Sequence, residues 1–121
     1  MRNLIARGVV VAVHDASDGG LAVALAEMAM AGGVGAVIEA PADVAAHAFW
    51  FGEDQARYIV AAQTSQVETV VAAALEAGVP CRRIGETGGP TLTLGGETSI
   101  LLSDLVGNYE EWLPEYMAGA L

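Results

Sequence analysis

The sequence contains no lysine, and its five basic residues, all arginines, face fifteen acidic residues in a chain of 121. The formal net charge at pH 7 is therefore −10. Nucleic acids and anionic membrane surfaces are bound through lysine and arginine, so this balance opposes both kinds of partner. Lysine also commonly contacts the phosphates of a nucleoside triphosphate. Its absence indicates that the chain does not hold a triphosphate by itself.

Cysteine and aromatic residues are also scarce. Cys81 is the single cysteine, which excludes an internal disulfide and a thiolate metal cluster and fits a reducing cytoplasm. No apolar run reaches the roughly twenty residues of a membrane-spanning helix, and no signal-peptide pattern follows Met1. Because 54% of the residues are hydrophobic but only 6% are aromatic, we expect a core built mainly from aliphatic side chains. The localisation expected from these features is cytoplasmic.

Apolar periodicity and turn residues predict helices that alternate with strands. We expect strands at residues 9–13, 34–39, 57–62, 82–86 and 91–94. We expect helices at residues 2–7, from Leu21 to the Gly32-Gly33 pair, at 43–49 with Asp43 as cap, from a Thr64 or Ser65 cap to Gly78, and from a Ser103 cap onward, with Pro114 kinking or ending the last one.

This order of elements predicts one α/β domain over residues 1–121, with a mixed sheet packed against helices. Residues 34–94 have a split βαβ pattern, which makes the expected fold partly ferredoxin-like.

The segment His-Asp-Ala-Ser-Asp-Gly-Gly-Leu, residues 14–21, lies where a strand passes into a helix. The first amides of a helix lack intrahelical partners and, with the helix dipole, favour an anion. Ser17, Asp18, Gly19 and Gly20 are therefore candidates for binding a phosphate, and the two glycines allow a close backbone approach. The alternative is a helix in which Ser17 or Asp18 itself caps the free amides.

His14 and Asp15 precede this turn and have the chemistry of an acid–base or metal pair. Such a pair at a strand end is more often structural, with the aspartate accepting hydrogen bonds from turn amides. We therefore assign no catalytic residue and no metal ligand in this chain.

The segment Phe-Gly-Glu-Asp-Gln-Ala-Arg-Tyr, residues 51–58, is the most polar part of the chain. Glu53, Asp54, Gln55 and Arg57 are candidates for a ligand site or an interface. The alternative is a solvated turn in which Arg57 pairs with a carboxylate. Further along, we expect Arg82 and Arg83 on alternate faces of a strand, with Cys81 as a core or edge thiol.

These two segments together resemble the second, carboxy-terminal half of the phosphoribosylformylglycinamidine synthase family. The resemblance runs in order from Val9 to Met117. It also includes Gly78-Val79-Pro80, Arg83-Ile84-Gly85 and Trp112-Leu113-Pro114.

The resemblance implies a superfamily shared with aminoimidazole ribonucleotide synthetase, selenophosphate synthetase and thiamine monophosphate kinase. Each repeat in these enzymes has an amino-terminal ATP-binding domain and a carboxy-terminal α/β domain. The synthase family carries two repeats and converts formylglycinamide ribonucleotide, ATP and glutamine-derived ammonia to the amidine, ADP and phosphate. This chain corresponds to the carboxy-terminal domain of the second repeat, excised from a longer polypeptide.

The resemblance further implies ATP and Mg²⁺ in the intact enzyme and neither in the isolated domain. The implied partners are the missing amino-terminal domains and a glutaminase subunit or domain. His14, Asp15, Glu53, Asp54, Gln55 and Arg57 then become candidates for an auxiliary nucleotide site or a domain interface. Two other possibilities remain: a non-catalytic module that binds a small ligand, and the equivalent domain of a sister enzyme, against which residues 51–58 argue.

Overall fold

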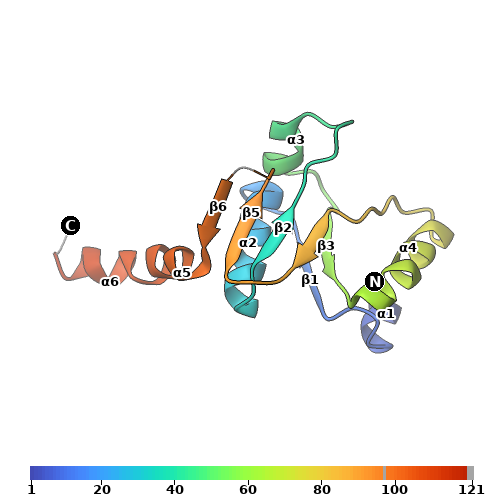
Figure 1. The fold of residues 1–121 in the computed structure, drawn as a ribbon, viewed down its shortest axis with the longest axis horizontal. Coiled ribbons are helices and arrows are strands. Elements are labelled where there is room, and N and C mark those ends of the chain that lie inside the picture. Colours follow the sequence, from blue (N-terminus) through green and yellow to red (C-terminus); the bar gives the residue numbers. More distant parts are fainter. Residues whose placement is uncertain (97, 120–121) are drawn as a thin grey trace.

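The computed structural model describes residues 1–96 and 98–119, and its strands form two sheets (Figure 1). The smaller sheet pairs β1 (Ala12–Asp15) with β3 (Tyr58–Ala61) in antiparallel orientation. The larger has the order β4-β2-β5-β6. Its strands are β2 (Ala36–Ile38), β4 (Gly85–Thr87), β5 (Thr91–Leu94) and β6 (Thr98–Leu101).

The larger sheet is mixed, as predicted. β2 and β5 run parallel, with Val37 opposite Thr93, whereas β2–β4 and β5–β6 are antiparallel. The chain between the two parallel strands passes through α3 (Ala46–Phe51), β3, α4 (Val67–Glu76) and β4 before it returns to the sheet. Such a long crossover is what parallel neighbours require, and the α/β class is confirmed.

The helices surround these sheets (Figure 1). They are α1 (Arg2–Ala6), α2 (Gly20–Gly32), α3 (Ala46–Phe51), α4 (Val67–Glu76) after a 3₁₀ turn at Thr64–Gln66, α5 (Leu102–Glu110) and α6 (Trp112–Met117). α2 covers one face of the larger sheet, and α1 and α4 lie beside the smaller one. α5 and α6 extend from the end of the molecule opposite to α1 and α4. Within the described ranges, no helix has the length and apolar character to cross a membrane.

Two apolar clusters hold the fold together. The larger joins Leu21 and Leu25 of α2 to Ile38 and Leu92 of the mixed sheet, each at most 6% exposed. The smaller consists of Val9 and Val10, which precede β1, and Val70 of α4. The sheet therefore positions α2, and α2 in turn fixes the turn at its own amino terminus.

The chain exposes more surface than its mass predicts. Its accessible area is 8231 Å², whereas a compact monomer of 12.4 kDa exposes about 6100 Å². Large apolar side chains such as Leu75, Trp112 and Met117, each more than half exposed, contribute to this surface. This open surface is available for contact with other protein.

Several predicted boundaries are wrong. The strand expected at 9–13 begins at Ala12, because Val9 and Val10 turn into the cluster under α4, while Val11 is 66% exposed. The fourth strand begins at Gly85, after Arg82 and Arg83, so these arginines do not alternate on a strand.

The predicted caps are also wrong. α3 begins after Ala45, and Asp43 instead binds Arg82, with Oδ1 3.0 Å from Nη1. α5 begins after Leu101 without a side-chain cap, directly from β6, a strand that we did not predict. Cys81 is exposed and outside any strand, contrary to the expected core or edge thiol.

The predicted effect of Pro114 is confirmed. The helix is interrupted at Glu111, between α5 and α6, and Pro114 lies in the first turn of α6. A proline there has no amide to donate to the carbonyl four residues earlier, which ends the preceding helix.

Candidate functional site

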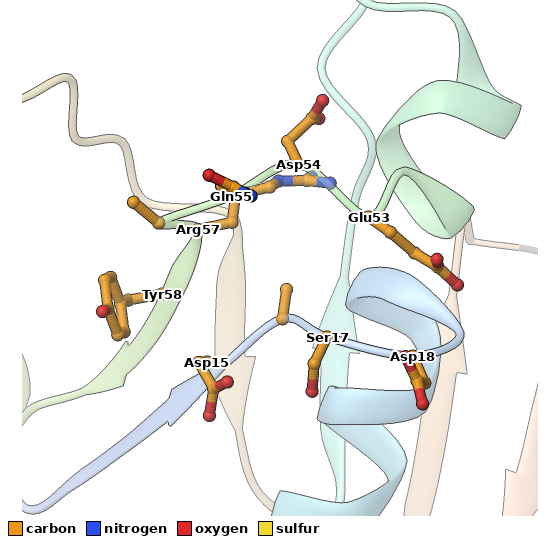
Figure 2. A pocket seen from close by; sticks show the side chains of 10 residues that line it. Asp15, Ser17, Asp18, Glu53, Asp54, Gln55, Arg57 and Tyr58 are labelled. Atoms are coloured by element: carbon orange, nitrogen blue, oxygen red, sulfur yellow. The ribbon is translucent and has the colours of Figure 1, made fainter.

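The two polar segments lie side by side, as Figure 2 shows. Asp15 at the end of β1 stands opposite Tyr58 at the start of β3. One residue further, the amide of Ala16 donates to the carbonyl of Arg57 at 2.8 Å. The segments enclose an open hollow of about 340 Å³, which is lined by residues 15–18 and 53–58. The sheet pairing therefore brings together most of the candidate residues, although His14, Gly19 and Gly20 do not line the hollow.

The amino terminus of α2 already holds a carboxylate. Gly19 adopts φ +82° before the helix, and its amide donates to Oε1 of Glu53 at 2.9 Å. The next amide, of Gly20, donates to the carbonyl of Ser17 at 2.9 Å. The helix dipole favours a negative charge at this end. Glu53 is therefore the anion that the turn binds in this chain.

This arrangement differs from both interpretations of the turn. In the part of the chain that the structure describes, neither Ser17 nor Asp18 caps the first amides with its side chain. The acceptor comes instead from the second segment, which sequence spacing alone does not indicate. Figure 2 shows Glu53 reaching toward the start of α2, whereas Asp54 points away from it. The binding of an external phosphate at this turn stays a prediction, and its direct contact with the Gly19 amide requires that this amide be released from Glu53.

Gly20 is required by contacts within the protein. A Cβ on this residue would lie 2.8 Å from the carbonyl carbon of Phe51 and 2.9 Å from the carbonyl oxygen of Trp50. Its φ of +68° is also in the left-handed region, which glycine tolerates best. The close approach that we predicted for a ligand is thus made at Gly20 by the end of α3.

Arg57 binds backbone carbonyls. Nη2 donates to the carbonyl of Phe49 at 2.8 Å and Nη1 to that of Gly52 at 3.1 Å. The guanidinium carbon also lies 5.6 Å from the centre of the Phe49 ring. A cation at the carboxyl end of a helix satisfies its free carbonyls and opposes its dipole. The pair between Arg57 and a carboxylate, which belonged to the alternative interpretation, is absent from the ion pairs of the described residues.

His14 does not line the hollow. Its Nδ1 donates to the carbonyl of Asp15 at 2.6 Å, and Nε2 lies 3.2 Å from Oε2 of Glu27 on α2. The ring therefore links β1 to α2, which supports the structural interpretation of His14. Asp15 lines the hollow but accepts no hydrogen bond from a turn amide in the ranges described, so that part of the interpretation is wrong.

The hollow is electrostatically negative. Asp15, Asp18, Glu53 and Asp54 are all exposed around it, and the guanidinium of Arg57 is already bound to carbonyls. Among residues 1–96 and 98–119, no group of three or more acidic, histidine or cysteine side chains is placed to bind a metal. The carboxylates suit hydroxyl or amine donors, whereas a phosphate here needs a cation from elsewhere.

Sequence reasoning did not single out Tyr58, which also lines the hollow and is 60% exposed. A signal was present, because strand alternation places Tyr58 on the face opposite to Ile59, which is 8% exposed. An exposed aromatic ring beside a hollow offers a stacking surface for a planar group.

Comparison with known proteins identifies related chains. Residues 1–95 match the family model described as AIR synthase related protein, C-terminal domain. The chain is similar over its whole length, at 68% identity, to phosphoribosylformylglycinamidine synthase subunit PurL of Methylocella silvestris. It is 53% identical over 99% of its length to the subunit of the same name from Bradyrhizobium sp. strain BTAi1. The chain spans 16% of the length of each of these relatives.

Solved structures share the fold. The chain superposes on PurL of Thermotoga maritima complexed with ADP with a TM-score of 0.74, at 17% identity, over 85% of this chain and 20% of that one. The same protein complexed with ATP gives a TM-score of 0.71, at 17% identity and the same coverage.

Proposed function

Because the chain belongs to the family of carboxy-terminal domains of AIR synthase related proteins, we propose a specific place for it in a larger enzyme. We propose that it forms the carboxy-terminal domain of the second repeat of phosphoribosylformylglycinamidine synthase. The observation that carries this proposal is the 68% identity to a PurL subunit across all 121 residues. Since the chain spans 16% of that relative, the proposal makes it one domain of a longer polypeptide.

The proposed reaction of the whole enzyme is the ATP-dependent conversion of formylglycinamide ribonucleotide to its amidine with glutamine-derived ammonia. Structures of Thermotoga maritima PurL are described as complexed with ATP, with ADP and with FGAR, which supports ATP as the nucleotide. We further propose Mg²⁺ as the metal, a glutaminase subunit or domain as the source of ammonia, and the cytoplasm as the location. A structure described as PurLQS supports an assembly with other subunits. Nucleic acid and membrane are not among the proposed partners.

Within that enzyme, we propose that the hollow between β1 and β3 faces another domain, as an auxiliary nucleotide site or an interface. Its carboxylates are suited to accept hydrogen bonds from ribose hydroxyls, and Tyr58 is suited to stack on a planar ring. Phosphate contact at Ser17–Gly20 then requires that Glu53 leave Gly19, or that a cation lie between the two anions. The other domains supply that cation, because Arg57 is already bound to carbonyls.

We also propose that the isolated chain is catalytically inactive. A single negative hollow with no lysine does not bind and orient a triphosphate. We assign no catalytic residue here, since His14 lies outside the hollow.

The test is an assay of ADP release by the full-length polypeptide expressed from its own gene. Release should depend on formylglycinamide ribonucleotide, ammonia and Mg²⁺ together, and the chain of 121 residues alone should stay at background. ADP release that does not require the ribonucleotide would overturn the proposed reaction. Turnover by the isolated chain would overturn its role as a non-catalytic domain.

A further inference from the structure

Residues 102–119, named here the C-terminal arm, comprise α5 and α6 and lie beyond residue 95, where the family match ends. Figure 1 shows the arm extending away from the mixed sheet. α5 is anchored by Leu102, which is 9% exposed, and α5 also contacts α2. α6 has no buried residue and packs chiefly on α5. The arm therefore leaves most of α6 facing solvent in this chain.

One face of α6 is apolar and exposed. Trp112, Leu113, Tyr116 and Met117 occupy positions i, i+1, i+4 and i+5, which lie on one side of a helix. Their exposed fractions run from 56% to 76%. The rings of Trp112 and Tyr116 stack with centroids 5.6 Å apart, which fixes them as one flat surface. A rigid aromatic anchor of this kind is typical of helices that bind in grooves.

The remainder of the arm is acidic. It carries Asp104, Glu110, Glu111 and Glu115, and Arg83 is the last basic residue in the sequence. Two copies of the arm therefore repel each other, as do two copies of a chain with net charge −10. The complementary surface is apolar at its centre and rimmed by arginine or lysine.

At the base of the arm, α2 and α5 enclose a second hollow of about 410 Å³. Its walls are mainly apolar and include Val23 and Met30 from α2 and Leu105 and Tyr109 from α5. Tyr109 is 71% exposed and lies three residues before Trp112, so the hollow adds to the apolar surface of α6. The apolar area that a partner can cover is thus larger than the apolar area of α6 alone.

We propose that the C-terminal arm docks, through the face formed by Trp112, Leu113, Tyr116 and Met117, into an apolar groove rimmed by basic residues on another domain of the same polypeptide. This proposal rests on the proposed function, since it requires the chain to be one domain of a longer protein. The relatives that match the arm are about six times longer than the chain, which supplies the domain. The exposed area also exceeds that of a compact monomer by about 2100 Å², enough for an interdomain interface of about 600–1,500 Å².

The first test places a thiol on the docking face of the full-length polypeptide, as Met117→Cys. Mass mapping of the labelled peptide reports how fast a thiol reagent modifies this position. Adding Glu111→Lys and Glu115→Lys should accelerate labelling at least about tenfold, because these changes repel a basic rim and release the helix. Adding Glu68→Lys and Glu76→Lys on α4 instead, with the same change in charge, should leave labelling slow. Equal rates in both backgrounds would overturn the proposal.

The second test keeps the docking face unaltered. A carbodiimide condenses carboxylates with nearby lysines to amides, and each link expels one water. Cross-links from Glu110, Glu111 or Glu115 should reach a lysine of the same polypeptide, so that the product keeps the mass of one polypeptide less the water lost. Cross-links that double the mass would identify a second copy as the occupant and overturn the proposal. ADP release is measured on the same preparations. An active enzyme with an undocked arm disproves only the docking, and a docked arm in an inactive polypeptide disproves only the synthase reaction.

Discussion

The Oε1 atom of Glu53 accepts a hydrogen bond of 2.9 Å from the amide of Gly19, a residue 34 positions away in the sequence. This contact joins the turn before α2 to the loop between α3 and β3. The same two segments also contact each other at Gly20, where a Cβ would clash with the backbone of Phe51. Glu53 and Gly20 thus hold the start of α2 against the end of α3.

Removing this carboxylate should destabilise the fold. Glu53→Ala leaves the Gly19 amide without its acceptor, and the loss of a helix cap costs about 0.5–2 kcal/mol. Glu53→Gln keeps an acceptor but loses the charge, so the cost should fall to about 0.3–1 kcal/mol. Urea denaturation of the chain measures both. Asp54→Ala is the matched control, because Asp54 is exposed and no side-chain hydrogen bond to it is seen in the described residues. An equal loss from Asp54→Ala would disprove the cap.

Gly20→Ala should destabilise the chain more than Gly8→Ala. Both residues have positive φ, +68° and +64°, so both substitutions carry a backbone cost of about 1–2 kcal/mol. Only Gly20 meets a neighbour, since a Cβ on Gly8 has nothing within 4 Å. The difference between the two free energies of unfolding therefore reports the clash with α3. Equal values would show that α2 and α3 separate easily at this point.

Arg82→Ala should raise the pKa of the Asp43 carboxyl toward its ordinary value. In the native chain, a side-chain hydrogen bond from Arg82 is the largest cause of a lowered pKa at Asp43, followed by a backbone hydrogen bond and the arginine charge. A lowered pKa in the folded state means that the ion pair favours folding above the unfolded pKa and is lost as pH falls through the folded one. An NMR titration of Asp43 measures the change, with Arg83→Ala as the control. No shift after Arg82→Ala would contradict the ion pair.

Local signals in the sequence were enough to predict much of the fold. The spacing of Leu21 and Leu25 gives the buried face of α2, and Gly33, at φ +60°, ends that helix as predicted. Pro114 marks the break before α6 through its missing amide. In each case the decisive interaction joins residues within about one helical turn of each other. Residue propensity and spacing are therefore enough to predict it.

Contacts between distant segments escaped prediction. Leu75 follows Val71 at helical spacing on α4 but is 78% exposed, because only Val70 on that helix is buried by the smaller cluster. β6 was missed since it passes directly into α5 with no turn residue between them. The Glu53 cap depends on the β1–β3 register, which no local pattern specifies. The motifs were therefore enough to identify the residues of the candidate site. The hydrogen-bond partners of these residues could be identified only from the fold.

The occupied turn determines how the chain should respond to free phosphate. In an NMR titration at millimolar phosphate, we expect the amide signals of Gly19 and Gly20 to stay in place. Glu53 already accepts from the first of these amides, and the carboxyls of Asp15 and Asp18 repel a further anion. With Glu53→Ala, the Gly19 amide becomes free at the positive end of α2, and a salt-sensitive shift should appear. Asp54→Ala removes the same charge from the hollow without freeing an amide, so it should produce no shift. A shift in the unaltered chain would mean that Glu53 yields to phosphate unaided. A shift with Asp54→Ala equal to that with Glu53→Ala would mean that overall charge, and not the freed amide, controls the binding.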